Sequence, residues 1–150
     1  MTNLELSIEN KAAYKKYQIL EKIEAGISLL GQEVKSIKSG RINLGGSYVI
    51  IKNQQAYLIG TTIPPYQPNN KTSNYQPDRT RTLLLKKSEI RYLIGKSQQK
   101  SLTLVPLKVY TKRGIIKLEF GIVRILSKVD KRESIKDKEV EKRIRRVFRG

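Results

Sequence analysis

Residues 102–124, LTLVPLKVYTKRGIIKLEFGIVR, decide the fold class more clearly than any other part of the chain. Leu102–Thr111 and Ile115–Arg124 are rich in Ile, Val, Leu and Tyr, the composition that favours β-strands. Lys112–Gly114 separates them, and a short connection that contains Gly suits two antiparallel neighbours. The stretch therefore predicts a β-hairpin.

Earlier segments repeat this pattern. Ser47–Lys52 and Ala56–Gly60 flank a polar connection and predict a second hairpin. Tyr17–Ile23 and Gly26–Leu30 predict a third pair of strands that turns at Glu24–Gly26. Short strands joined by tight turns favour a mainly β fold, an antiparallel sheet that closes into a small barrel.

Helical signals are few. Asn10–Lys16 predicts a first helix or turn, and Gln32–Ser39 predicts a helix that ends before a Gly. Ser88 is expected to cap a short helix, Glu89–Ile94, which Gly95 closes. We therefore expect the helices to flank the barrel.

Composition narrows the function. The chain has 150 residues with 31 Lys+Arg against 13 Asp+Glu, a net charge of +18, and neither Cys nor His. Disulfides, thiolate or imidazole metal ligands and Cys- or His-based catalysis are thereby excluded. So large an excess charge is typical of proteins that bind a polyanion. No run approaches the ~18 apolar residues of a membrane span, so RNA or DNA is the favoured partner.

Charge density changes near residue 127. Residues 1–127 hold 21 basic and 8 acidic side chains, whereas residues 128–150 hold 10 and 5 within a much shorter length. We therefore predict an RNA-binding barrel over 1–127 and a basic tail over 128–150. The apolar stripe of the tail is thin, so we expect it to be disordered until it meets a partner.

Candidate RNA contacts are basic and aromatic. Lys and Arg neutralise phosphates, and Tyr rings stack on unpaired bases. Among the eight Tyr, Tyr48 and Tyr57 are predicted to favour the core, whereas Tyr17 is equally balanced between core and base stacking. The basic clusters are Lys11, Lys15 and Lys16; Lys35, Lys38 and Arg41; Arg79, Arg81, Lys86 and Lys87; and Lys108, Lys112, Arg113, Lys117 and Arg124.

Glu24 and Glu33 are two of the few acidic residues in the body. A carboxylate on a basic, RNA-facing surface is costly unless it accepts a hydrogen bond from a base amino group or a 2′-hydroxyl, or pairs with a Lys. For Glu24, beside Gly26, an RNA contact and an ordinary turn carboxylate both stay open.

An ordered series of short segments extends over residues 10 to about 145. It comprises Asn10-Lys11-Ala12, Tyr17, Glu24-Ala25-Gly26-Ile27, Gly31-x-Glu33-Val34-Lys35-Ser36, Gly40-Arg41-x-Asn43-Leu44, Ser47-Tyr48, Pro65-Tyr66, Asp78-Arg79-x-Arg81, Leu83-Leu84-Leu85, Leu102-Thr103-Leu104-Val105-Pro106-Leu107, Lys112-Arg113-Gly114 and Asp130-Lys131-Arg132. Together these segments resemble the SmpB (SsrA-binding protein) family of bacterial trans-translation.

The resemblance implies an oligonucleotide/oligosaccharide-binding-like (OB-like) closed β-barrel without enzymatic activity or cofactor. It implies binding to the tRNA-like domain of transfer-messenger RNA and delivery of that RNA to the A site of stalled ribosomes. The tail would become helical in the empty mRNA channel. We expect a monomer in the bacterial cytoplasm. A plastid stroma is the alternative location, because a chain rich in Lys, Ile and Asn indicates an AT-rich genome, which plastids have.

The resemblance also implies site residues. The RNA-binding set is Asn10, Lys11, Tyr17, Glu24, Lys35, Ser36, Arg41, Asn43, Leu84, Lys86, Lys117 and Arg124. The set in the tail that would contact the ribosome is Asp130, Lys131, Arg132, Ile135, Lys136, Lys142 and Arg143. No catalytic or metal-binding residue is expected.

Ile125–Val129 departs from the family, which usually has a Gly-Lys-Lys segment before the Asp-Lys-Arg motif. Two other functions are alternatives to the delivery of transfer-messenger RNA. One is an OB-type ribosomal RNA-binding or assembly protein. The other is an RNA-modifying enzyme that uses carboxylates and a metal, which the scarcity of acidic residues disfavours.

Overall fold

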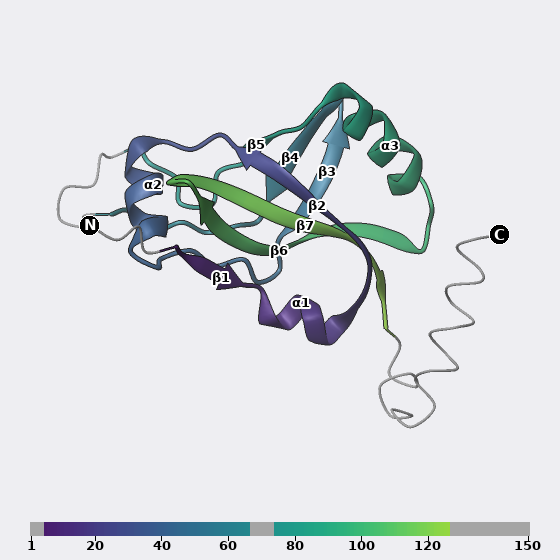
Figure 1. The fold of residues 1–150 in the computed structure, drawn as a ribbon, viewed down its shortest axis with the longest axis horizontal. Helices are drawn as coiled ribbons and strands as arrows, with labels where there is room; N and C mark the ends of the chain where they lie inside the picture. Colours follow the sequence, from purple (N-terminus) through teal and green to yellow (C-terminus); the bar gives the residue numbers. More distant parts are fainter. Residues whose placement is uncertain (1–4, 67–73, 127–150) are drawn as a thin grey trace.

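The computed structural model describes residues 5–66 and 74–126, which form a mainly β fold with short helices (Figure 1). The predicted tail and its ribosome-contacting residues therefore lie outside the described residues. The described elements are β1 (Ser7–Glu9), α1 (Lys11–Lys16), β2 (Tyr17–Ile27), α2 (Gly31–Lys38), β3 (Tyr48–Lys52), β4 (Gln55–Ile59), β5 (Arg81–Leu84), α3 (Lys87–Ser97), β6 (Leu102–Lys112) and β7 (Ile115–Ile125).

The described strands form one antiparallel sheet in the order β1-β6-β3-β4-β5-β2-β7, and β6 also pairs with β7. The long strands β2, β6 and β7 cross the middle of the molecule in Figure 1, with α1 below them, α2 at the left and α3 at the upper right. The prediction of an antiparallel, mainly β fold with few helices is confirmed.

Both hairpins predicted from their flanking strands are present. Lys112 pairs with Ile115 across Arg113 and Gly114, and Lys52 pairs with Gln55 across Asn53 and Gln54. All four turn residues have positive φ, between 51° and 79°. Two central residues with positive φ are what a type I′ turn requires, and this turn matches the twist of the strands that it joins.

The predicted turn at Glu24–Gly26 is wrong, because β2 continues through it to Ile27. Ala25 is buried at 2% exposure. A Cβ at Gly26 would lie 3.2 Å from the Cβ of Leu84 on β5. The two small residues therefore mark close packing of neighbouring strands rather than a change of direction.

The first two helices lie close to their predicted positions, and the third differs. Asn10 caps α1 by accepting a hydrogen bond from the backbone N–H of Ala13. Ser88 does not cap α3, because the helix begins at Lys87, two residues before the predicted start, and the capping residue is Lys86, whose backbone N–H donates to Glu89. Gly95 lies inside α3, which continues to Ser97.

Two apolar clusters hold the fold together. The larger one packs against one face of the sheet and includes the fully buried Leu58, Leu118 and Phe120. The smaller one lies under α1, where Ala13 packs with three residues of β6 and β7, namely Val105, Leu107 and Val123. Burial against the second cluster fixes α1, and with it the start of β2, on the outer side of the sheet.

Gly121 on β7 is a position where close packing leaves no room for a methyl group. A Cβ there would lie 2.9 Å from Leu107 Cδ1 and 3.2 Å from the backbone oxygen of Glu21. Gly121→Ala is therefore expected to lower the free energy of unfolding by about 1–3 kcal/mol, measured by urea denaturation.

Gly95→Ala is the matched control, since a Cβ at this helical position meets nothing within 4 Å. It is expected to raise stability by about 0.5–1 kcal/mol. Equal stability of the two variants would show that the packing around Gly121 is looser than described.

Candidate nucleic-acid interface

A surface groove of about 610 Å³ brings together four of the predicted RNA-binding residues, Glu24, Leu84, Lys86 and Lys117. They come from β2, β5, the start of α3 and β7. The remaining lining residues are Lys22, Ile23, Gly26, Leu85 and Glu89. The groove is therefore cationic overall, with three lysines against the two carboxylates of Glu24 and Glu89, and it has an apolar wall.

Strand register explains why these side chains meet. Gly26 on β2 pairs with Leu84 of β5 on one side and with Lys117 of β7 on the other. Side chains alternate between the two faces of a strand, so Glu24 is exposed while its neighbour Ala25 is buried. Continuity of β2 thus creates the groove, whereas a turn at this point would have dispersed its residues.

Glu24 is held by two partners from β6. The Tyr110 hydroxyl donates a hydrogen bond to Glu24 Oε2, and Lys112 Nζ lies 3.6 Å from Oε1. The Tyr110 hydrogen bond is the main cause of the lowered pKa of Glu24; burial opposes it, and the charges of Lys112 and Lys117 lower the pKa further. The carboxyl group is therefore ionised at neutral pH and acts only as an acceptor.

A second pocket, of about 340 Å³, lies beside α1 and brings together Asn10 and Tyr17. Lys16 Nζ lies 5.4 Å from the centre of the Tyr17 ring, and Tyr48 lines the same pocket. Tyr48 is 45% exposed, so the prediction that it favours the core is wrong. Tyr57 is half-buried on β4.

Asn10 and Ser36 have internal roles. The Asn10 side-chain amide donates to the backbone oxygens of Pro106, at 2.8 Å, and of Leu44. The Ser36 hydroxyl is fully buried and donates to the Pro64 oxygen at 2.8 Å. These bonds satisfy buried backbone acceptors, so the side chains of Asn10 and Ser36 hold the fold together rather than face a ligand.

The other predicted site residues lie outside the groove. Lys35 on α2 and Arg41, just after that helix, both contact Tyr66. Lys35 Nζ lies 6.0 Å from the centre of the Tyr66 ring, and the Arg41 guanidinium donates a hydrogen bond to the Tyr66 backbone oxygen. Asn43 accepts a hydrogen bond from the Gly45 N–H within its own turn. Lys11 is exposed at the start of α1, and Arg124 is half-buried on β7.

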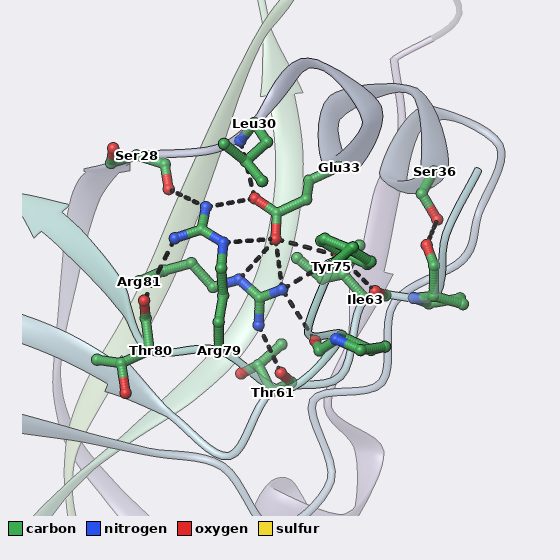
Figure 2. A network of polar contacts seen from close by, with 12 residues as sticks. Ser28, Leu30, Glu33, Ser36, Thr61, Ile63, Tyr75, Arg79, Thr80 and Arg81 are labelled. Atoms are coloured by element: carbon green, nitrogen blue, oxygen red, sulfur yellow. Dashed lines mark hydrogen bonds and ion pairs between the residues drawn. The ribbon is translucent and has the colours of Figure 1, made fainter. Parts of the chain in front are cut away.

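Glu33 is buried at the centre of a polar network that ties α2 to β5 and to the segment before it (Figure 2). Arg79 and Arg81 each place a guanidinium nitrogen 2.5 Å from one of its carboxylate oxygens. Tyr75 donates to the Glu33 carboxylate and to the Ile63 backbone oxygen. Burial tends to raise the pKa of Glu33, but the hydrogen bonds from Arg79, from the Leu30 backbone N–H and from Arg81 outweigh it and lower the pKa.

Arg81 was expected on the surface as a phosphate ligand, and that expectation is wrong. Its side chain has 0% exposure, and the guanidinium donates hydrogen bonds to the Glu33 carboxylate and to the backbone oxygens of Thr61 and Pro77. A fully buried guanidinium is tolerated because the Glu33 charge lies directly against it.

Lys22 is a groove residue that the sequence pattern did not single out. The alternation of Lys22 and Glu24 with Ile23 and Ala25 would have placed both on one exposed face, had β2 been recognised as continuous. The pairing of Tyr110 with Glu24 leaves no local sequence signal, because the two residues lie 86 positions apart in the chain.

The sequence profile described as SmpB protein matches residues 7–150. The chain belongs to the SmpB family. The SsrA-binding protein of Desulfitobacterium hafniense strain DCB-2 is 45% identical over 141 residues, which cover 94% of this chain and 90% of that protein. The SsrA-binding protein of Gloeothece citriformis is 45% identical over 144 residues, covering 96% and 93%.

A solved structure supports the SmpB assignment. It is described as "tmRNA-SmpB: a journey to the center of the bacterial ribosome" and matches this chain with a TM-score of 0.69 and 43% identity. The match covers 81% of this chain and 85% of the other. No helix among the described residues is long and apolar enough to span a membrane.

Proposed function

We propose that this protein is a trans-translation factor. It binds the tRNA-like domain of transfer-messenger RNA and delivers it to the A site of stalled ribosomes for rescue and peptide tagging. The observation that carries the proposal is membership of the SmpB family over almost the whole chain, among relatives named for binding SsrA. Family membership is also the reason to propose a binding function rather than an enzymatic one.

The groove supplies the chemistry for RNA binding. Lys22, Lys86 and Lys117 line it and offer charges to phosphates. Leu84, which is 60% exposed, offers an apolar surface to an unstacked base. The proposed interface extends to the pocket beside α1, where Tyr17 stacks on a base, and to basic residues outside both sites, namely Lys11, Lys35, Arg41 and Arg124.

We infer further that the sheet is a closed, OB-like barrel. The support is that β6 pairs with β3 through Val49 and Leu104 and with β7 along most of its length. Such a fold binds single-stranded or irregular RNA on one face of the sheet. The cytoplasm is the proposed location, because translating ribosomes work there.

Reconstituted translation on a message without a stop codon tests the function. Addition of the full-length protein together with transfer-messenger RNA is expected to release the ribosome and tag the nascent peptide. Absence of tagging, with a known SmpB protein active in the same mixture, would contradict the proposal.

The proposed tail function has a separate test. Truncation after Arg132 is expected to leave binding to the tRNA-like domain within about two-fold, because the groove and the pocket are intact and charges that do not contact the RNA are largely screened by salt. Peptide tagging is expected to be lost, because the removed residues would contact the mRNA channel. Tagging by the truncated protein at the full-length rate would contradict the role of the tail.

A further inference from the structure

Glu24 is a carboxylate that the fold fixes inside a cationic groove. It lies on β2 between the lysines of the groove, and Tyr110 and Lys112 hold it from β6. A negative charge here repels the phosphates that the lysines attract. Its partner in a bound RNA is therefore a hydrogen-bond donor, which in RNA means a base N–H group or a 2′-hydroxyl.

The Glu24 carboxylate retains free acceptor capacity. An ionised carboxylate has about four lone-pair positions on its two oxygens. Tyr110 uses one position on Oε2, and Lys112 Nζ stays 3.6 Å from Oε1. The side chain is 39% exposed, so both oxygens remain able to accept a hydrogen bond from a ligand in the groove.

Leu84 provides the surface on which a base would lie. It stands in the same groove as Glu24, and its Cβ approaches the backbone of β2 because residue 26 is Gly. An apolar side chain that is 60% exposed gains from contact with the face of a base. Glu24 lies two residues along β2 from Gly26, the partner of Leu84, so a base stacked on Leu84 would have the carboxylate beside it, within reach of its edge.

Guanine fits this acceptor best among the four bases. Its Watson–Crick edge carries two adjacent donors, N1–H and N2–H, and two parallel N–H···O bonds to one carboxylate are strong and specific. Adenine and cytosine present one amino donor beside a ring-nitrogen acceptor, which would face the second carboxylate oxygen. Uracil presents one N–H between two carbonyl acceptors.

We propose that Glu24 reads the Watson–Crick edge of one unstacked guanine in the bound RNA, and that Tyr110 is a positioning residue that orients the Glu24 carboxylate for this contact. The proposal rests on the proposed function, since it names the base that the groove takes from transfer-messenger RNA. It adds a contact that depends on the identity of the base. The other contacts of the groove do not, since its lysines bind phosphates and Leu84 contacts the face of any base.

Inosine interference tests the reading of guanine, because inosine is guanosine without the N2 amino group. The tRNA-like domain is transcribed with phosphorothioate-tagged inosine at random guanosine positions, bound to full-length protein, and the bound and free fractions are compared. Inosine is expected to be depleted from the bound fraction at one guanosine. With Glu24→Gln the depletion at that position is expected to disappear, since Gln offers only one acceptor oxygen.

Tyr110→Phe tests the positioning role. Loss of one hydrogen bond to an exposed carboxylate is expected to weaken RNA binding about five-fold. It is also expected to raise the midpoint of the Glu24 carboxyl titration followed by NMR, because the Tyr110 hydrogen bond is the main cause of the lowered pKa. A role of Tyr110 in packing alone would leave that titration unchanged.

Tyr92 and Glu21 provide the matched control, a second Tyr–carboxylate pair that joins α3 to β2 with Tyr92 Oη–Glu21 oxygen distances of 2.6 and 2.7 Å. Neither residue lines the groove. Tyr92→Phe and Glu21→Gln are therefore expected to leave both affinity and the interference pattern unchanged.

The possible failures are distinct. If wild-type protein binds the tRNA-like domain but shows no inosine-sensitive guanosine, or keeps the same one in Glu24→Gln, guanine reading is overturned while the proposed function stands. If wild-type protein does not bind the tRNA-like domain, the proposed function fails and the guanine contact fails with it.

Discussion

Glu33→Gln is expected to lower the free energy of unfolding by about 3–5 kcal/mol, as breaking a buried ion pair does. The substitution keeps the shape of the side chain and removes its charge. Arg81, with no exposure to solvent, would then be left as a buried cation without a counter-charge, and Arg79 would lose the same partner. Urea denaturation at neutral pH measures the loss.

The pH dependence of stability gives this prediction a second readout. The pKa of Glu33 is lower in the folded protein than its ordinary value of 4.5. The stabilisation from its ionised form is therefore fully present above that value and is lost as the pH falls through the folded pKa. The stability gap between wild type and Glu33→Gln should narrow below pH 4.5.

Glu21→Gln is the control for Glu33→Gln, because Glu21 also contacts a Tyr and a cation but at an exposed position. Its expected cost is at most about 1 kcal/mol. Comparable losses in the two variants, or a gap between Glu33→Gln and wild type that does not change with pH, would show that the buried network contributes no charge-dependent stability.

Simultaneous substitution of Lys22, Lys86 and Lys117 by Ala is expected to weaken binding to the tRNA-like domain on the order of 100-fold at ~150 mM salt. All three line the groove. Each lost phosphate contact removes about 0.7–0.9 from the slope of log K against log salt, which is about five-fold in affinity at this salt concentration. Binding isotherms between ~50 and ~300 mM salt measure both quantities.

A control triple variant removes the same charge elsewhere. Lys52, Arg91 and Lys100 are exposed and do not line the groove or the pocket beside α1. Their replacement by Ala is expected to change affinity only a few-fold, through the weaker long-range field. If the two triple variants lose equal affinity, RNA binds through overall charge rather than through the groove.

The sequence predicted those parts of the fold that are determined locally. The β6–β7 hairpin follows from two apolar runs around Arg113 and Gly114, and α1 follows from its capping Asn10. Errors arose where a distant partner decides the conformation. Gly26 resembled a turn residue, but Leu84, 58 positions later in the chain, is what requires a Gly there.

The same reason limits prediction of the site. Four residues of the groove were singled out individually by charge or family resemblance, but strand register alone shows that Glu24, Leu84 and Lys117 meet. No local pattern distinguishes the buried Arg81 from a surface Arg, because its partner Glu33 lies 48 positions away. Tyr110 escaped notice as a partner of Glu24 for the same reason.

The central claim is that the cationic groove and its surroundings recognise one particular folded RNA. Its most direct test compares the dissociation constants of the full-length protein for the tRNA-like domain of transfer-messenger RNA and for an unrelated folded RNA of equal length, both at ~150 mM salt. Nonspecific binding is weak at that salt concentration. We expect a preference on the order of 100-fold or more for the tRNA-like domain, and equal dissociation constants would contradict the proposed function.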